Sequence, residues 1–151
     1  MKKKLIMTSI FVAIIAVFFA VDYLISLRYQ IELVSLNPNP AYADGETPVK
    51  IRVRVTKGGA PVEGHTMSAL SLNGGRFDAY RILSDENGEA EFTYFPYLAS
   101  ALVPAQDVTI QVRDESNSVF IAVPAKTLFE LPLKMPEAGG DFGTNDSLFG
   151  E

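Results

Sequence analysis

The sequence predicts an all-β sandwich of seven or eight strands, preceded by one transmembrane α-helix and followed by a flexible tail. Three observations carry this prediction. They are a 23-residue apolar run near the N-terminus, a period-two alternation of apolar and polar residues that recurs after it, and turn residues between the alternating runs. With 151 residues, the chain has room for one ordinary domain and an anchor, but not for two full-sized folds.

The apolar run extends from residue 5 to residue 27 and contains a single charge, Asp22. As a helix it would be roughly 35 Å long, which is enough to cross a bilayer. A cleaved secretory signal shares the basic start and the apolar run. However, the run exceeds the usual apolar region of a signal, about 7 to 15 residues. In addition, cleavage after Ala20 would require a small residue at position 18, where this chain has Phe18. A retained signal-anchor is therefore favoured.

The charges around this run predict its orientation. Three lysines, at positions 2–4, precede it, so we expect residues 1–4 in the cytoplasm and everything after Arg28 on the extracytoplasmic side of the cell membrane. Asp22 lies near the outer end of the run, where a simple interfacial residue is favoured over a functional intramembrane carboxylate.

The clearest strand is residues 49–56, in which Val49, Ile51, Val53 and Val55 alternate with polar residues. One face of this strand must be buried. Similar segments, separated by Gly-, Pro-, Asn- and Asp-rich turns, predict further strands at 29–35, 65–72, 77–83, 89–94, 108–113, 119–123 and 126–131. Their number and spacing over residues 28–133 fit an immunoglobulin-like sandwich, with a closed barrel as the alternative.

The order of turns and strands also resembles the bacterial immunoglobulin-like domain of the invasin and intimin type (Big-1). The matching pieces are the Ala43-Asp44-Gly45 turn, the alternating strand at 49–55, and the segments 59–64, 73–75 and 84–90. The resemblance covers roughly residues 33–125. It implies a Greek-key sandwich outside the cytoplasm that acts as a spacer, adhesive module or assembly domain, and it carries over no catalytic residues. This chain differs from tandem family members in having one copy on an N-terminal membrane anchor.

The composition argues against several kinds of chemistry. Cysteine is absent and His65 is the only histidine, so thiolate catalysis, disulfides and Cys-ligated metals are excluded, and a zinc site is disfavoured. His65 is expected at a strand edge or on the surface, although a Ser-His-acid arrangement stays open. Asp85 and Asn87 are expected to form a turn rather than a calcium site. We therefore expect no enzyme activity, no cofactor and no metal.

Charge also bears on the partners. The formal charge is −5, and since the lysines at 2–4 against Asp22 give +2 for residues 1–27, residues 28–151 carry −7. A nucleic-acid partner is therefore not expected. On the strand at 49–56, Lys50, Arg52 and Arg54 form a basic stripe that is either paired with Glu89 and Glu91 of a neighbouring strand or contacts lipid head groups or anionic wall polymers.

Two segments are candidates for binding a protein. Residues 94–104 are unusually apolar for a connection, so they either close the core or meet a partner. The acidic stretch 134–151 has no strand pattern and predicts a flexible tail whose apolar side chains dock a partner or only aid solubility. The candidate contact residues in the two segments are Phe95, Tyr97, Leu98, Leu102, Val103, Phe142, Leu148 and Phe149.

Taken together, these patterns predict a membrane-anchored, extracytoplasmic binding or assembly subunit of a cell-envelope complex. Its expected partners are the lipid bilayer and an envelope protein. An adhesive or wall-contacting surface module is the alternative, because the basic stripe would serve it. An envelope hydrolase is less favoured, because the chain offers few catalytic groups.

Overall fold

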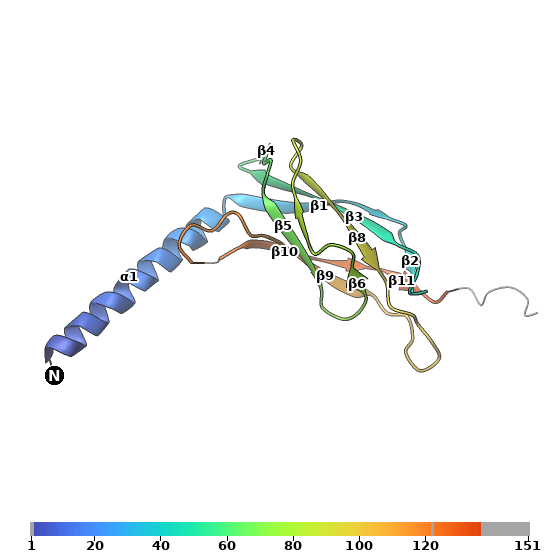
Figure 1. Ribbon diagram of the computed structural model, residues 1–151, viewed down its shortest axis with the longest axis horizontal. Coiled ribbons are helices and arrows are strands. Elements are labelled where there is room, and N and C mark those ends of the chain that lie inside the picture. The colour runs from blue at the N-terminus through green and yellow to red at the C-terminus, as the bar shows by residue number, and fades with distance from the viewer. Residues whose placement is uncertain (1, 122, 137–151) are drawn as a thin grey trace, which may run out of the picture.

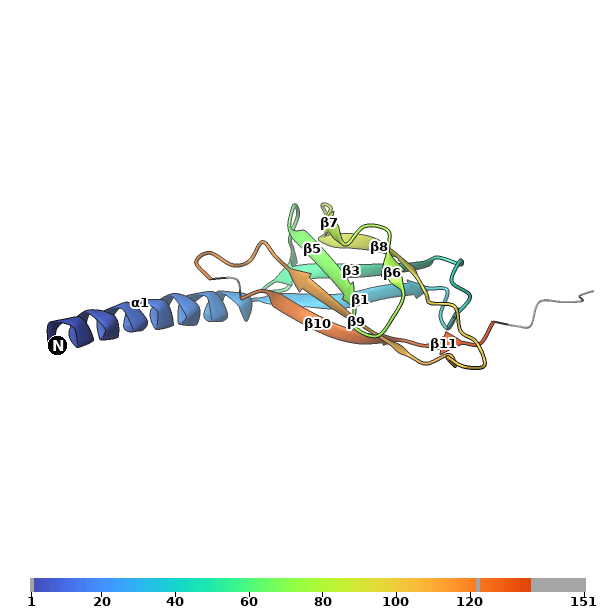
Figure 2. The ribbon, with the colours of Figure 1, turned by 60° about the horizontal axis from the view of Figure 1, so that its bottom comes forward.

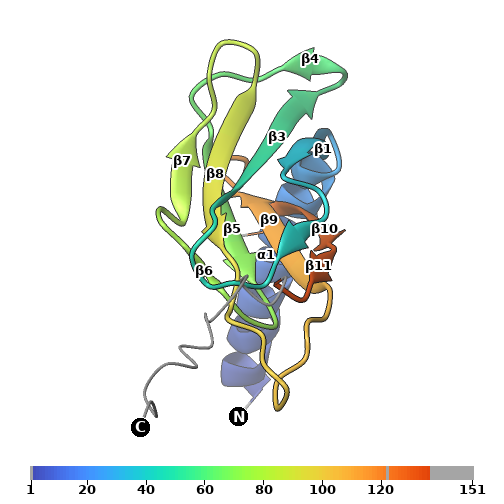
Figure 3. The same ribbon diagram turned by 90° about the vertical axis from the view of Figure 1, so that its right-hand side faces the viewer.

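The computed structural model describes residues 2–121 and 123–136, which form one helix and a two-layer β-sandwich (Figure 1). Helix α1 (Lys2–Ser26) projects from one end of the sandwich. Most of its apolar side chains are exposed, because no other element covers this part of the helix. The end of the sandwich away from α1, which we call the distal end, carries β2 (Ala41–Tyr42) and β11 (Leu133–Lys134) and faces the viewer in Figure 3.

Two antiparallel sheets make up the sandwich. The first has the order β1 (Tyr29–Asn37), β3 (Val49–Lys57), β8 (Glu89–Phe95) and β6 (Arg76–Phe77), and β4 (Ala60–Pro61) also pairs with β3. The second has the order β10 (Ala125–Leu131), β9 (Val108–Asp114), β5 (Thr66–Ser71) and β7 (Arg81–Leu83). At the distal end, β2 and β11 form a short parallel pair.

The chain crosses from the first sheet to the second between β4 and β5, between β6 and β7, and again between β8 and β9. This is the Greek-key arrangement of an immunoglobulin-like sandwich, so the predicted fold class is confirmed. Six of the described strands have six to nine residues, and the other five have two or three. The short ones raise the number of strands above the prediction, because two residues are too few to show an alternating pattern.

The core lies between the two sheets and follows the predicted alternation. On β3, Val49, Ile51, Val53 and Val55 are fully buried, whereas Lys50 and Arg52 are exposed. Side chains from both sheets meet them, and the fully buried ones include Phe92, Tyr94, Met67, Val108, Ile110 and Val112. Apolar burial of this kind is the main source of stability for the sandwich.

Two of the predicted strands are wrong. Residues 77–83 do not form one strand, because β6 lies in the first sheet and β7 in the second, with a bend at Asp78–Tyr80 between them. The described residues of 119–123 form no strand either. Instead, the N–H groups of Val119, Phe120 and Ile121 donate to the side chain of Asp22, so no strand partner is available for them.

Helix α1 leads directly into the edge strand β1 (Figure 2), and its axis is inclined to that strand (Figure 1). Only Leu27 and Arg28 separate them. The N–H of Leu27 donates to the carbonyl of Tyr23 at 3.2 Å, and that of Arg28 donates to the carbonyl of Ile25 at 3.0 Å. Because the last helical turn is closed in this way, the sandwich begins immediately where the helix ends.

Candidate partner-binding surfaces

The connection from β8 to β9, residues 96–107, forms a distal loop at the end of the sandwich away from α1 (Figure 1). Part of this loop closes the core. Pro96 and Ala99 are buried, and Tyr97 packs half-buried against the core. The Tyr97 hydroxyl donates to the carbonyl of Pro104 at 3.1 Å and accepts the N–H of Gln106 at 2.8 Å, which ties the two ends of the loop together.

The tip of the loop is apolar and exposed. Leu102 exposes 93% of its surface, and Leu98 exposes 66%. The Ser100 N–H donates to the carbonyl of Val103 at 2.8 Å, and the Ser100 hydroxyl accepts the N–H of Val103 at 3.2 Å, so a tight turn holds Leu102 outward. Met135, half-exposed, lies beside the loop with its sulfur 3.4 Å from the N of Ala105. We call Leu98, Leu102, Val103 and Met135 the distal apolar patch.

The base of the loop is fixed by Asp44, which forms a β-bridge with Leu98. The Asp44 carboxylate accepts the N–H of Glu46 at 2.9 Å and that of Thr47 at 2.8 Å, together with the Thr47 hydroxyl. Burial by itself would raise the pKa of Asp44, but these hydrogen bonds outweigh it and lower the pKa below the ordinary value. The base of the loop is therefore attached to a turn that is fixed by hydrogen bonds to Asp44.

The structure divides the five residues of segment 94–104 predicted to bind a partner. Leu98, Leu102 and Val103 are exposed, whereas Tyr97 is engaged in closing the loop. Phe95 is half-buried, with the guanidinium carbon of Arg76 4.7 Å from the centre of its ring. Partner contact through these residues stays a prediction. The three predicted tail contacts, Phe142, Leu148 and Phe149, lie outside the described residues.

The basic stripe is paired across β3 and β8, as one of the two readings predicted. Arg52 Nη2 lies 2.8 Å from Glu91 Oε2, and Arg54 forms an ion pair with Glu89. Lys50 Nζ lies 3.5 Å from Glu91 Oε1. The hydrogen bond from Arg52 lowers the pKa of Glu91, while the same contact raises the pKa of Arg52. Contact of the stripe with an anionic surface stays a prediction.

His65 lies at the start of β5, at the end of the sandwich near α1. Its Nδ1 is 2.7 Å from Oδ2 of Asp114, which is fully buried, and its ring centre is 5.3 Å from that of Tyr29. The nearby Ser84 hydroxyl donates to the carbonyl of Val62 at 2.7 Å and accepts the N–H of His65 at 3.0 Å. Because this hydroxyl is already bound to the backbone, the group fits a structural contact better than an activated nucleophile.

The segment from Asp85 to Gly88 forms a turn, as predicted. The Asp85 carboxylate accepts the N–H of Asn87 at 2.9 Å and that of Glu89 at 2.8 Å, and the Gly88 N–H donates to the Asp85 carbonyl at 2.9 Å. No group of three or more His, Asp or Glu side chains within residues 2–121 and 123–136 is placed to hold a metal ion.

Sequence reasoning missed the contact between Asp22 and the loop before β10. Asp22 is fully buried, and its carboxylate accepts the N–H groups of Val119 at 2.9 Å, Phe120 at 2.8 Å and Ile121. The ring of Phe120 also stacks on that of Phe18 in α1, with centres 4.7 Å apart. A single charge inside an apolar run was the available sign, but nothing in the sequence identifies a partner 97 residues away.

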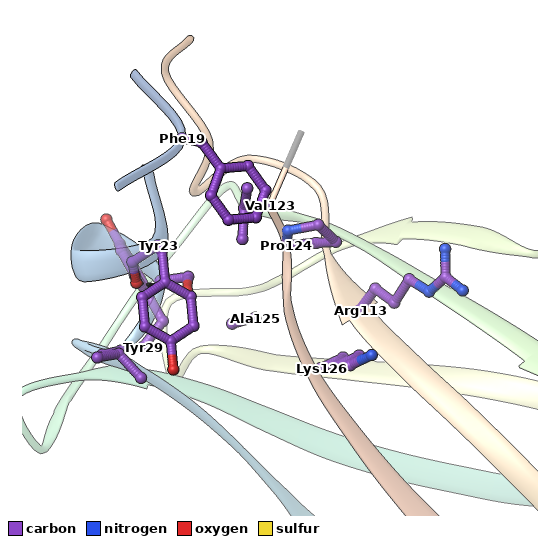
Figure 4. Close-up of a pocket in the computed structure, with 10 residues that line it drawn as sticks. Phe19, Tyr23, Tyr29, Arg113, Val123, Pro124, Ala125 and Lys126 are labelled. Carbon is purple, nitrogen blue, oxygen red and sulfur yellow. Dashed lines mark hydrogen bonds between the residues drawn. The ribbon is translucent and has the colours of Figure 1, made fainter. Parts of the chain in front are cut away.

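A recess of about 610 Å³ lies beside this contact, between α1 and the starts of β1 and β10 (Figure 4). Tyr23 and Tyr29 lie on its helix side, and Arg113 and Lys126 lie on its strand side. Its full lining consists of Phe19, Tyr23, Ser26, Leu27, Tyr29, Arg113, Val123, Pro124, Ala125 and Lys126. The recess therefore combines aromatic rings with positive charges.

Within the described residues, one helix is long and apolar enough to cross a membrane, judged by length and composition. It covers Ile6–Ser26, 21 residues with a mean hydropathy of 2.3.

No family model matches the chain, and no curated protein matches it. Solved structures that it resembles include the D00-D0 domain of intimin, with 14% identity, a TM-score of 0.47 and coverage of 68% of this chain and 48% of that one. A C-terminal intimin fragment in complex with the intimin-binding domain of the translocated intimin receptor shows 19% identity and a TM-score of 0.49, covering 68% of this chain and 33% of that one. A conjugative transposon lipoprotein from Bacteroides eggerthii shows 18% identity and a TM-score of 0.40, covering 69% of this chain and 96% of that one.

The structures that resemble this chain thus include intimin domains, the type that its sequence motifs predict. The matched region spans half or less of each of these intimin chains. The immunoglobulin-like fold itself follows from the strand order of this chain.

Proposed function

We propose that this chain is a non-enzymatic, membrane-anchored subunit of a cell-envelope complex that binds a protein partner outside the cytoplasm. One observation carries the proposal: an apolar helix and an exposed apolar loop lie at opposite ends of the sandwich (Figure 1). In this arrangement α1 holds the domain at the bilayer, with the lysines at 2–4 in the cytoplasm. The distal apolar patch then faces away from the membrane.

The distal apolar patch is a better partner site than the basic stripe. Leu102 has no apolar cover, and exposed apolar side chains gathered at one place commonly mark an interface. In contrast, Arg52 and Arg54 already face glutamates, so the stripe has little unpaired charge to offer. An envelope protein with an apolar groove would bury Leu98 and Leu102 together.

Retention of the helix is supported by the Asp22 contact. A cut between residues 22 and 26 would separate the fully buried Asp22 carboxylate from the three N–H groups that donate to it. Left alone, those groups would lose their partners. A secreted form trimmed in this region would overturn the anchored part of the proposal.

A photo-crosslinking side chain at Leu102 tests the partner site in intact cells. Leu128 on β10 is the matched control, because it is also a leucine and exposes 55% of its surface. We expect a discrete crosslinked product from position 102 that is absent from position 128, and its loss when Leu98 is changed to Ser. Equal products from both positions, or none from position 102, would count against the distal apolar patch.

The adhesive or wall-contacting module is the second reading, and the basic stripe is the feature that favours it. It predicts that binding weakens as salt rises, because screening acts on exposed charges. The variant with Lys50→Gln, Arg52→Gln and Arg54→Gln would then lose binding. If the Leu102 crosslink is unchanged by salt and by these substitutions, the subunit reading is favoured.

The tail contributes a separate part of the proposal, in which Phe142, Leu148 and Phe149 dock the same partner. Ending the chain after Lys134 removes all three residues. This truncation also removes Met135 from the distal apolar patch. A second variant, in which Phe142, Leu148 and Phe149 are each changed to Ser, keeps the patch complete. An undiminished Leu102 crosslink in the second variant would exclude docking by the tail.

A further inference from the structure

We propose that residues 118–121, the membrane loop, enter the leaflet that the sandwich faces, alongside α1, and that Asp22 makes this entry possible. The inference rests on the proposed function in one respect, since it requires α1 to span the bilayer. It adds a second, domain-borne contact with lipid, which would hold the sandwich in one orientation on the membrane.

The exposed side chains of this loop are apolar. Val119 exposes 65% of its surface and Phe120 exposes 55%. Phe120 is not directed away from the helix, because its ring stacks almost parallel on that of Phe18, with 11° between the ring planes. The loop lies beside the last turns of α1 (Figure 1) and so extends the apolar surface of the helix sideways. In water this surface would be an unfavourable exposure, whereas in lipid it would be buried.

The depth of the contact follows from the helix geometry. The apolar span ends at Ser26, and Asp22 and Phe18 precede that end by four and eight residues. At about 1.5 Å per residue, they lie about 6 Å and about 12 Å inside the end of the span. A span of 21 residues only just matches a hydrocarbon core of about 30 Å. Consequently, a loop that touches Phe18 and Asp22 must reach below the surface of the leaflet.

The backbone of the loop is prepared for such an environment. Non-helical backbone enters a membrane only where its polar groups find partners within the protein. Here the N–H groups of Val119, Phe120 and Ile121 all donate to Asp22, and the N–H of Val123 donates to the Ser118 hydroxyl at 2.9 Å. The same three donors surround the Asp22 carboxylate. These hydrogen bonds reduce the free-energy cost of placing a charged group at this depth in the membrane.

The surrounding charges match a lipid surface. Arg113 and Lys126 are directly opposite each other in the β9–β10 register, and both line the recess beside the loop (Figure 4). Together with Arg28, which follows the helix, they form no ion pair with an acid of the described residues. Like charges in this position repel each other unless an anion lies between them, and lipid phosphates supply that anion. Tyr23 and Tyr29 add the aromatic rings that favour the interface.

The natural sequence contains no tryptophan, so one introduced tryptophan reports on one place. We would reconstitute the full-length chain in vesicles of phosphatidylcholine and phosphatidylglycerol with brominated acyl chains, which quench tryptophan within the hydrocarbon. Phe120→Trp reports on the membrane loop, Phe11→Trp on the middle of α1, and Leu102→Trp on the distal end. We expect quenching and a blue-shifted emission for positions 11 and 120, and neither for position 102.

The possible results separate this inference from the proposed anchor. Quenching at position 11 without quenching at position 120 would overturn the membrane loop and leave the anchor in place. Absence of quenching at both positions would overturn both. Quenching at position 120 that persists in vesicles of phosphatidylcholine alone would support insertion and show that it does not require a net negative membrane, since phosphatidylcholine also carries a phosphate.

The role of Asp22 has its own test. In the Phe120→Trp chain, Asp22→Ala should abolish most of the quenching, because three N–H groups then need water. Asp22→Asn should have a smaller effect, since its side-chain oxygen still accepts. Amide exchange of β3 in the same variants shows whether the sandwich stays folded. Unchanged quenching with Asp22→Ala, in a folded sandwich, would refute the assigned role.

Discussion

Substitutions at Tyr97 and Leu102 can show whether the distal loop stabilises the fold, binds a partner, or does both. Tyr97→Phe keeps the ring against the core and removes only the oxygen that donates to Pro104 and accepts from Gln106. A typical hydrogen bond contributes about 1 kcal/mol net, so the loss of both should cost about 1–2 kcal/mol. For a domain of about 100 residues, each 1 kcal/mol lowers the melting temperature by about 4–8 °C.

Leu102→Ser is the matched change at the tip of the same loop. Because Leu102 is 93% exposed, its replacement should alter stability by less than about 0.5 kcal/mol. Thermal unfolding of the full-length chain in detergent, followed by near-ultraviolet circular dichroism, measures both variants. We expect Tyr97→Phe to melt at a clearly lower temperature and still be bound by the partner, and Leu102→Ser to melt like the natural chain and lose the partner.

The opposite pattern would refute this reasoning. If Leu102→Ser melted several degrees lower, the loop tip would contribute to the fold and not to an interface. If Tyr97→Phe melted within a degree of the natural chain, the two hydrogen bonds would not stabilise the loop. Loss of partner binding in both variants without any change in melting would make the whole loop, including its base, part of the interface.

Three further predictions concern the sandwich itself. Gly88→Ala should lower the free energy of unfolding in urea more than Gly58→Ala does. Both glycines have a left-handed backbone, which costs alanine about 1–2 kcal/mol. Only at Gly88 would the added Cβ also lie 2.5 Å from the carbonyl oxygen of Val55. Asp44 has a lowered pKa in the folded state, so its contribution is present above about pH 4 and is lost as the pH falls through the folded pKa; Asp44→Asn should therefore melt lower than the natural chain at pH 6, and the gap should shrink by pH 3. Arg52→Gln removes an exposed ion pair with Glu91 and should shift the melting temperature less than Tyr97→Phe, with any shift disappearing at high salt; a larger shift would mean that the pair is not screened by solvent.

The first sheet could be predicted from the sequence because its signal is local. Val49 to Val55 alternate without interruption, and burial of one face follows directly from that period. The glutamates at 89 and 91 repeat the same period, so their pairing with Arg54 and Arg52 could be expected once the two strands were placed side by side.

The errors arose where tertiary contacts override the local pattern. The Val-Phe-Ile sequence at 119–121 has high strand propensity, but its N–H groups are taken by Asp22, and a contact over such a separation leaves no periodic sign. Residues 77–83 look continuous, but the chain changes sheets within them. In the distal loop, composition alone could not tell Tyr97, which is tied down, from Leu102, which is free to meet a partner.

The direct passage from α1 into β1 has a mechanical consequence. Tension between the membrane and a partner held at the distal loop would travel through β1 into β3 and then into β8, since β1 pairs with β3 at eight positions and the loop follows β8. The pull runs along these strands, so it would load their hydrogen bonds together, in shear, rather than open them one after another. A domain loaded in this way resists unfolding by force until all the hydrogen bonds between two neighbouring strands break together.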